Sequence, residues 1–224
     1  MTSETIANAQ PYWDRYYAAS FTFGRGTEDI LTMLAGLPPA AVWLDLGAGS
    51  ESLLWSIPLD VGQLIAADLD PDRLALLRRY AAAEQPRGAY RTVLKLCRRT
   101  DTDFAARCRR LTATVVADCL TEQPVPFRDG TVSLVTQFGL LGLTSGHRDF
   151  LACWNSAHQP LSSGGWCAGA NWSAVTACNR VGLSRQLYAA AFAGSGIAPS
   201  LIKRVPVDGD ADFDSVWIYL GRKT

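Results

Sequence analysis

Short apolar runs alternate along this chain with longer segments of helical character, and this alternation constrains the fold more than any other feature. Each run has the length of one buried strand. The runs cover residues 41–46, 63–68, 112–118, 131–137 and 165–171, followed by 201–207 and 215–220. Strands that alternate with helices predict an α/β sandwich with a mainly parallel sheet. We expect the last two runs to close this seven-stranded sheet as an antiparallel pair.

The segments between the runs predict the helices. Pro11 stands early in the first, where its missing N–H costs nothing, and Gly36 with Pro38 and Pro39 ends the second. Residues 87–111 are arginine-rich and weakly periodic, so only their last third predicts a helix. The expected helices cover residues 8–19, 28–35, 71–83, 102–110, 148–161 and 183–193.

Composition excludes several classes of protein. The 224 residues include 21 basic and 21 acidic side chains, so the net charge is zero and the basic surface of a nucleic-acid-binding protein is missing. No apolar run reaches the roughly 18 residues of a membrane-spanning helix. The N-terminal segment lacks the basic and apolar parts of a signal peptide. We therefore expect one cytoplasmic domain, residues 1–224, that binds neither nucleic acid nor membrane.

Cysteine and histidine usage argues against a metal site. The six cysteines, residues 97, 108, 119, 153, 167 and 178, are never closer than eleven residues in sequence, so no CxxC pair exists. Reduced thiols in core positions are the simpler interpretation. The two histidines, His147 and His158, stand eleven residues apart in an expected helix, unlike the zinc-binding pair of an HExxH motif, which is four residues apart.

The motif LDLGAGSES, residues 44–52, carries most of the chemical information. A strand ends in Gly47-Ala48-Gly49, and glycines there allow a tight turn and close approach of a ligand to the backbone. A dinucleotide-binding motif would have a third glycine where Ser52 stands. Asp45 would repel a pyrophosphate and attract a cation. The turn therefore suits a ligand without phosphates that carries a positive charge.

Two further acids follow the next strands. Asp68 ends the second strand, nineteen residues after Gly49, where an acid can bind both hydroxyls of a ribose. Asp118 ends the third strand and could accept a hydrogen bond from an adenine amine. Asp70, by contrast, reads as the N-cap of the helix that begins at Pro71.

With these residues the chain resembles class I S-adenosylmethionine (SAM) methyltransferases over nearly its whole length. The segments that carry the resemblance are LDLGAGS, IAADLDPDRL, VPFRDGTVSLV and PLSSGGW. The pattern YxxxYY at the N-terminus, GAYRTVLKL and the basic segment before VVADC are similar to the branch that contains nicotinamide, phenylethanolamine and thioether methyltransferases. The resemblance implies a Rossmann-like core over residues 40–224 and N-terminal lid helices over residues 1–37.

The resemblance also implies a role for each matching residue. SAM, as methyl donor, would be bound by Tyr12, Tyr17, Asp45, Gly47, Ala48, Gly49, Asp68, Leu69, Asp118 and Cys119. Within that set the glycines would line the methionine end, Asp68 the ribose, and Asp118 with Cys119 the adenine. Tyr12 and Tyr17 would close over the sulfonium, since aromatic faces attract cations. Tyr16 and Asn171 are the candidate catalytic residues, and Gln137 and Trp172 the candidate substrate-binding residues.

One departure from the family leaves the reaction open. Amine methyltransferases of this branch tend to have an acid at the end of the fifth strand, where this chain has Asn171, and residues 138–143 contain no acid either. An ammonium substrate would then pay an uncompensated desolvation cost. We expect methyl transfer to nitrogen or sulfur of a small molecule. The alternatives are a SAM cyclase that forms azetidine-2-carboxylate and methylthioadenosine, and a SAM-binding protein without activity.

Overall fold

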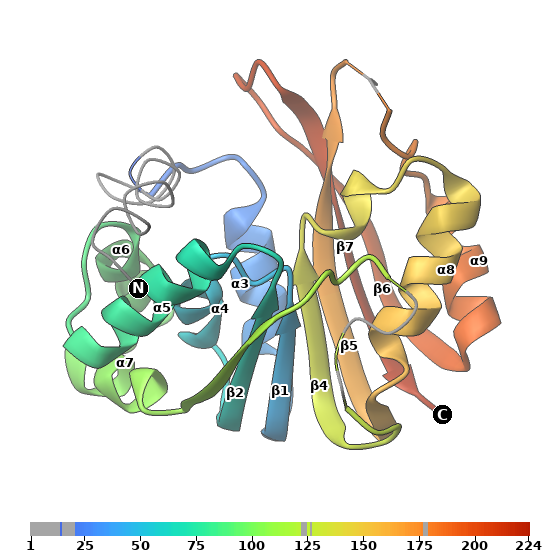
Figure 1. Cartoon of the computed structure of the whole chain (residues 1–224). Coiled ribbons are helices and arrows are strands. Elements are labelled where there is room, and N and C mark those ends of the chain that lie inside the picture. The colour runs from blue at the N-terminus through green and yellow to red at the C-terminus, as the bar shows by residue number, and fades with distance from the viewer. Residues whose placement is uncertain (1–13, 15–20, 122–124, 126, 177–178) are drawn as a thin grey trace.

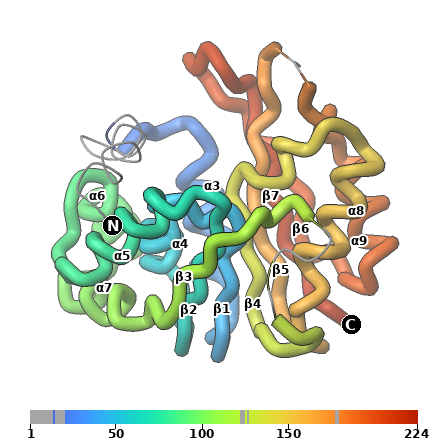
Figure 2. The backbone as a smooth tube through the Cα atoms, viewed as in Figure 1, coloured from blue at the N-terminus to red at the C-terminus, as the bar shows by residue number. Residues whose placement is uncertain are grey.

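The computed structural model describes residues 14, 21–121, 125, 127–176 and 179–224 (Figures 1 and 2). Its centre is one seven-stranded sheet. The strands are β1 Ala40–Leu46, β2 Val61–Asp68, β3 Leu111–Val116, β4 Val132–Phe138, β5 Leu161–Ala174, β6 Ile197–Pro206 and β7 Phe213–Lys223. All seven runs expected from the sequence are therefore strands.

The order of the strands is β3-β2-β1-β4-β5-β7-β6. The five strands from β3 to β5 are parallel to one another, and β7 runs antiparallel between β5 and β6. The chain proceeds from β1 outward through β2 to β3 and then returns to the other side of β1 with β4. Ligands in open α/β sheets bind at such a reversal, outside the carboxyl ends of the strands.

Helices cover both faces of the sheet (Figure 1). One face carries α4 Ser52–Ser56, α5 Pro71–Ala83, α6 Ala89–Leu96 and α7 Asp101–Cys108, and α3 Thr27–Ala35 belongs to the same apolar core. The other face carries α8 His147–His158 and α9 Arg185–Ser195, and the short 3-10 helix η2 Leu141–Leu143 follows β4. The helix expected over residues 8–19 lies outside the described residues.

Tryptophan and tyrosine rings fill the core under α8 and α9. Trp154 lies 4.7 Å from the ring centre of Tyr219 and 4.4 Å from that of His158. The His158 Nδ1 pairs with the carbonyl of Trp154 at 2.8 Å, and burial lowers the pKa of His158 to about 4. His158 is thus a neutral core residue. Among the described residues, no group of three His, Cys, Asp or Glu side chains could hold a metal ion.

Two element boundaries before β5 differ from those predicted from the sequence. The helix expected over residues 148–161 ends at His158, and the strand expected to begin at residue 165 begins at Leu161. Gly164 has a positive φ of 74°, and the pairing of β4 with β5 shifts register between Val132 and Leu134. The glycine pair that reads as the start of the strand is therefore an irregularity within it.

Two further differences concern β3 and the arginine-rich segment before it. The strand expected over residues 112–118 ends at Val116, because the Asp118 carboxylate accepts a hydrogen bond from the backbone N–H of Leu120 and turns the chain. Helix α6 has no counterpart among the expected elements. Its buried residues Tyr90, Val93 and Leu94 share one face, a spacing that the surrounding arginines obscure.

The described cysteines, residues 97, 108, 119, 153 and 167, are free thiols. Burial raises the pKa of Cys167 to about 12, so this thiol is a small core residue. Cys178 lies outside the described residues. No described helix is long and apolar enough to cross a membrane.

The close pairing at the centre of the sheet predicts that Gly169 tolerates no side chain. A Cβ there would lie 2.5 Å from the carbonyl oxygen of Gln137 and 2.6 Å from the Tyr219 hydroxyl. We expect Gly169→Ala to destabilise the fold by about 1–3 kcal/mol, because overpacking forces the strands apart. Thermal unfolding followed by circular dichroism should show a Tm lower by roughly 3–10 °C.

Gly194 in α9 is the matched control, since a Cβ there has no neighbour within 4 Å outside the helix's own backbone. Gly194→Ala should leave the Tm unchanged or raise it, because alanine favours the helix. Equal Tm values for Gly169→Ala and the wild type would contradict the pairing geometry.

Candidate functional site

The candidate site is the glycine turn between β1 and α4, at the carboxyl end of the parallel strands. Gly47 and Gly49 have positive φ angles of 63° and 52°, a conformation that favours glycine. A Cβ on Gly47 would lie 3.0 Å from the Cβ of Leu140. The turn after β1 therefore touches the segment after β4, and both lie at the reversal of strand order.

Asp68 at the end of β2 holds this turn. Its Oδ2 accepts a hydrogen bond of 2.8 Å from the backbone N–H of Gly49, and its Oδ1 accepts one of 2.8 Å from that of Asp70. Asp70 is the N-cap of α5, as the sequence predicts, and accepts from the N–H groups of Asp72 and Arg73. Each Asp68 oxygen retains a second lone pair for a ligand hydroxyl.

Asp45 lies one residue before the end of β1 and is buried. Its Oδ2 accepts from the Ser52 hydroxyl and its Oδ1 from the Thr136 hydroxyl, both at 2.6 Å. The Thr136 oxygen in turn accepts from the Trp43 indole N–H at 2.6 Å. Burial raises the pKa of Asp45 to about 7, although both hydroxyls act to lower it. Asp45 thus connects β1, β4 and α4 beneath the turn.

Glu51 is a further acid of the site that the sequence reasoning missed. It stands between Gly49 and Ser52, is 7% exposed, and its carboxyl accepts a hydrogen bond from the Ser50 hydroxyl. Burial raises its pKa to about 7, and the nearby Asp68 acts in the same direction. The sequence offered one signal for this residue, which is the presence of an acid inside the glycine turn. A side chain there is surrounded by backbone and does not reach far into solvent.

Three residues form the side of the site nearest β3. Asp118 is exposed just beyond the strand and accepts from Leu120 N at 3.0 Å. Cys119 is buried, and its thiol lies beside the backbone of Gly47, where burial raises the thiol pKa to about 12. Leu69 is 65% exposed directly after Asp68. The structure thus brings Cys119 to the glycine turn and leaves Asp118 and Leu69 open to solvent.

Gln137 and Asn171 form a buried polar network at the ends of β4 and β5. The Asn171 amide accepts from Gly142 N at 2.8 Å and donates to the Tyr188 hydroxyl at 2.9 Å. Gln137 accepts from Leu141 N at 3.1 Å and donates to the Tyr219 hydroxyl at 3.2 Å. Both side chains are fully buried and hold η2 in place.

Aromatic rings lie beside this network. Phe138 stacks on Trp55 with ring centres 4.4 Å apart, and Trp172 is half-buried next to Gly139. The Trp172 indole N–H donates to the carbonyl of Arg25 at 3.3 Å. Because Arg25 also pairs with Asp210 at 2.5 Å, the chain that leads to α3 is attached to the end of β5 and to the β6–β7 connection.

Charge is divided unequally between the two ends of the site. Asp45, Glu51 and Asp68 surround the glycine turn, whereas residues 137–143, at and beyond the end of β4, and residues 170–174, at the end of β5, contain no ionisable side chain. Tyr12, Tyr16 and Tyr17, expected to cover the site, lie outside the described residues. The described site therefore has an acidic end and a neutral, aromatic end.

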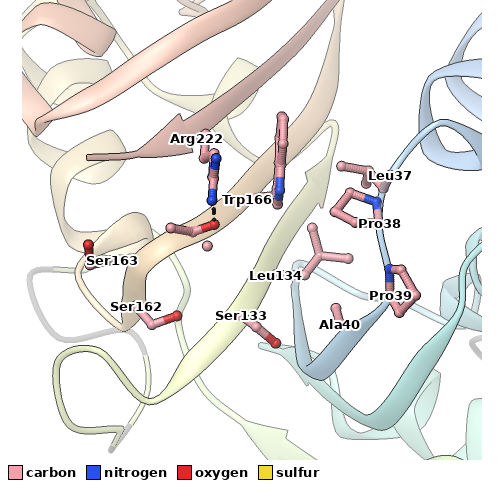
Figure 3. A pocket seen from close by; sticks show the side chains of 12 residues that line it. Leu37, Pro38, Pro39, Ala40, Ser133, Leu134, Ser162, Ser163, Trp166 and Arg222 are labelled. Atoms are coloured by element: carbon pink, nitrogen blue, oxygen red, sulfur yellow. Dashed lines mark hydrogen bonds between the residues drawn. The ribbon is translucent and has the colours of Figure 1, made fainter.

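A separate pocket of about 330 Å³ lies at the opposite edge of the sheet (Figure 3). It is lined by the amino ends of β1, β4 and β5, with Pro38, Ser133, Ser162 and Trp166 around it. Arg222 also lines this pocket, and its guanidinium donates a hydrogen bond to the carbonyl of Gly164 at 3.0 Å. None of the predicted site residues lines this pocket, so it is distinct from the candidate site.

Comparison with known proteins gives a match in structure only. No family model matches the chain, and no curated protein matches its sequence. Many solved structures do match in fold. A chain from the complex of the Haloferax volcanii Trm112 methyltransferase activator with a methyltransferase has a TM-score of 0.63 at 15% identity, over 97% of this chain and 93% of that one.

Two further neighbours cover nearly all of both chains. The N-methyltransferase NodS from Bradyrhizobium japonicum, solved with S-adenosylhomocysteine (SAH), has a TM-score of 0.63 at 11% identity and covers 98% of this chain and 95% of its own. Geranyl diphosphate C-methyltransferase from Streptomyces coelicolor, solved with Mg²⁺, geranyl diphosphate and SAH, has a TM-score of 0.60 at 12% identity, over 100% and 99%. The chain has the Rossmann-like methyltransferase fold.

The burial of Asp45 predicts a specific dependence of stability on pH. Its raised pKa means that the folded chain keeps a proton that the unfolded chain releases. This contribution to the free energy of unfolding is present below pH 4 and is lost as the pH rises to about 7. Asp45→Asn should remove it, so urea denaturation between pH 4 and 8 should show a shallower decline of stability than in the wild type.

Glu51 contributes in the same direction, so part of the decline should remain in Asp45→Asn. Asp129→Asn, at an exposed turn, is the control and should follow the wild-type curve. A decline in Asp45→Asn as steep as in the wild type would mean that Asp45 is ionised in the folded chain.

Proposed function

We propose that the chain is a SAM-dependent methyltransferase that acts on a small molecule. The observation that carries the proposal is Asp68, whose Oδ2 accepts from Gly49 in the glycine turn and whose Oδ1 accepts from Asp70, so that each oxygen keeps a second lone pair for a ligand. An acid in this place, beside a glycine turn at the reversal of strand order, suits the two hydroxyls of a ribose. The SAH-bound neighbours of the same fold support an adenosyl ligand.

The same geometry argues against a dinucleotide. Dinucleotide-binding turns offer backbone N–H groups to a pyrophosphate, whereas Gly49 here donates its N–H to Asp68. Asp45 and Glu51 add two buried carboxyl groups around the turn. A phosphate would meet these groups at close range, while a ligand that carries a sulfonium would be attracted once they ionise.

The proposed contacts follow the position of each residue. Gly47, Ala48 and Gly49 would lie along the methionine part, and Asp68 would bind the ribose. The adenine would lie against exposed Leu69 and against Cys119, which is placed between the glycine turn and β3. The carboxylate of exposed Asp118 would accept a hydrogen bond from the adenine amine. Tyr12 and Tyr17, which are outside the described residues, would complete the set as a lid.

Methyl transfer from SAM needs little acid–base catalysis by the protein. A nucleophile on the acceptor attacks the methyl carbon, the bond from that carbon to sulfur breaks, and the electron pair stays on sulfur to give SAH. The chain contributes alignment and exclusion of water. We assign the alignment to Tyr16 and to Asn171, the latter as a positioning residue because its amide holds Gly142 of η2. Gln137 holds the neighbouring Leu141 and would shape the same wall.

The neutral, aromatic end of the site restricts the acceptor. Phe138 and Trp172 offer ring surface, and residues 137–143 and 170–174 at the ends of β4 and β5 offer no carboxylate. A protonated amine would lose its hydration there without a counter-charge. We therefore infer that the acceptor is uncharged at its nucleophilic atom, as a thioether or an aromatic nitrogen is.

The same neutral end favours one alternative, in which SAM is the only substrate. The amino nitrogen of SAM, once deprotonated, attacks the carbon on the far side of its own side chain, next to sulfur. The bond between that carbon and sulfur breaks, which gives azetidine-2-carboxylate and methylthioadenosine. This reaction needs no second substrate and therefore no residue that anchors one.

Incubation of the purified chain with SAM alone, followed by mass spectrometry, separates the two reactions. Methyl transfer predicts no turnover until an acceptor such as a thioether or pyridine is added, and then SAH. Cyclisation predicts methylthioadenosine and azetidine-2-carboxylate in equal amounts without any acceptor. The absence of SAM binding in calorimetry would contradict both.

Replacement of Asp68 tests the ligand position. Loss of the carboxylate removes two charge-assisted hydrogen bonds to the ribose and releases the glycine turn. We expect Asp68→Ala to raise the Kd for SAM by about 10–100-fold, in isothermal titration calorimetry. Asp101→Asn, at the exposed start of α7, should bind SAM like the wild type. Unchanged affinity in folded Asp68→Ala would mean that the ligand lies elsewhere.

A further inference from the structure

Glu51 has no structural task that accounts for its burial. It is the N-cap residue of α4, yet its side chain makes no capping hydrogen bond to that helix. Among the described residues, only the adjacent Ser50 hydrogen-bonds to its carboxyl. Within the described part of the chain, no lysine or arginine lies within ion-pair distance of it.

The carboxyl is folded back over the glycine turn. A Cβ on Gly49 would lie 2.3 Å from Glu51 Oε2, so this turn accommodates the carboxyl only because residue 49 has no side chain. Gly49 is also the residue whose N–H is donated to Asp68. A ligand that approaches the turn therefore meets Glu51 and Asp68 together.

The groups that face Glu51 come from three elements. Arg73 of α5 acts to lower its pKa, whereas Asp68 at the end of β2 raises it. Tyr90 of α6 lies close enough that Glu51 raises the tyrosine's own pKa. Burial outweighs the effect of Arg73, so the pKa of Glu51 lies at about 7. The carboxylate form of Glu51 is disfavoured by burial, so a ligand that brings a positive charge close to it would stabilise that form strongly.

We propose that Glu51 is a specificity-determining residue that distinguishes SAM, which carries a sulfonium, from the uncharged sulfide product. This inference rests on the proposed SAM binding and extends it. Glu51 gives up its proton when the positive ligand binds, and the carboxylate then attracts the sulfonium. Once sulfur has lost its charge, in methyl transfer or in cyclisation, that attraction is gone. Substrate is thereby held more tightly than product, which promotes exchange.

The test is calorimetry of SAM and SAH with the wild type and Glu51→Gln. The glutamine keeps the shape of the side chain and removes its charge. We expect the Kd for SAM to rise about tenfold and the Kd for SAH to change less than twofold. Glu51→Asp keeps the charge and should restore most of the preference for SAM. Equal losses for both ligands in Glu51→Gln would overturn the proposal.

Proton release gives a second readout that a merely structural residue would not change. Titrations at pH 6.5 in phosphate and in Tris, which differ in ionisation enthalpy, report the protons released on binding. The wild type should release more with SAM than with SAH, and Glu51→Gln should lose that difference, while Asp129→Asn, at an exposed turn away from the site, should keep it. Equal release with both ligands in the wild type would overturn the proposal even if Glu51→Gln does not fold.

Two outcomes separate the role of Glu51 from SAM binding itself. If the wild type binds neither SAM nor SAH, the proposed function is wrong and the inference is overturned with it. If the wild type binds both and Glu51→Gln keeps the full preference for SAM, only the role of Glu51 is wrong.

Discussion

The hydrogen bond from the backbone N–H of Gly49 to the Asp68 carboxylate is the interaction on which the candidate site depends. It joins the turn after β1 to the end of β2, two strands that already pair along their length. The left-handed conformation of Gly49 directs the N–H toward the neighbouring strand. Because the acid that holds the turn is also the acid that would hold a ribose, one residue sets both the shape of the turn and the position of the ligand.

The rest of the site follows from how buried charge is distributed around that bond. Asp45 is stabilised from below by hydroxyls of Ser52 and Thr136, whereas Glu51 lies above the turn with only Ser50 as a hydrogen-bond donor. Beyond the turn, Asn171 uses an uncharged amide to hold η2. A buried acidic end and an uncharged, aromatic end thus lie at the same end of the sheet.

The sequence predicted the fold better than the site. Alternating apolar runs and helices identified all seven strands, and the parallel strands stand out because helices cover both faces of their part of the sheet, which favours nearly continuous apolar runs. Boundaries failed where backbone geometry decides, as at Gly164, whose positive φ marks an irregularity inside β5 that looks in the sequence like the start of the strand. Helix α6 was missed because the arginines around it obscure the spacing of its buried residues.

By itself the sequence determined which chemical groups stand near the strand ends, since Asp45, Asp68 and Asp118 each lie at the end of an apolar run or one residue before it. Only the tertiary structure decided how those groups differ. Asp45 is sealed beneath the turn, Asp68 binds the turn and Asp118 lies in solvent. Glu51 joined them because the chain folds back at Gly49. Burial and hydrogen bonding depend on residues brought together from separate strands, and no local pattern in a sequence records them.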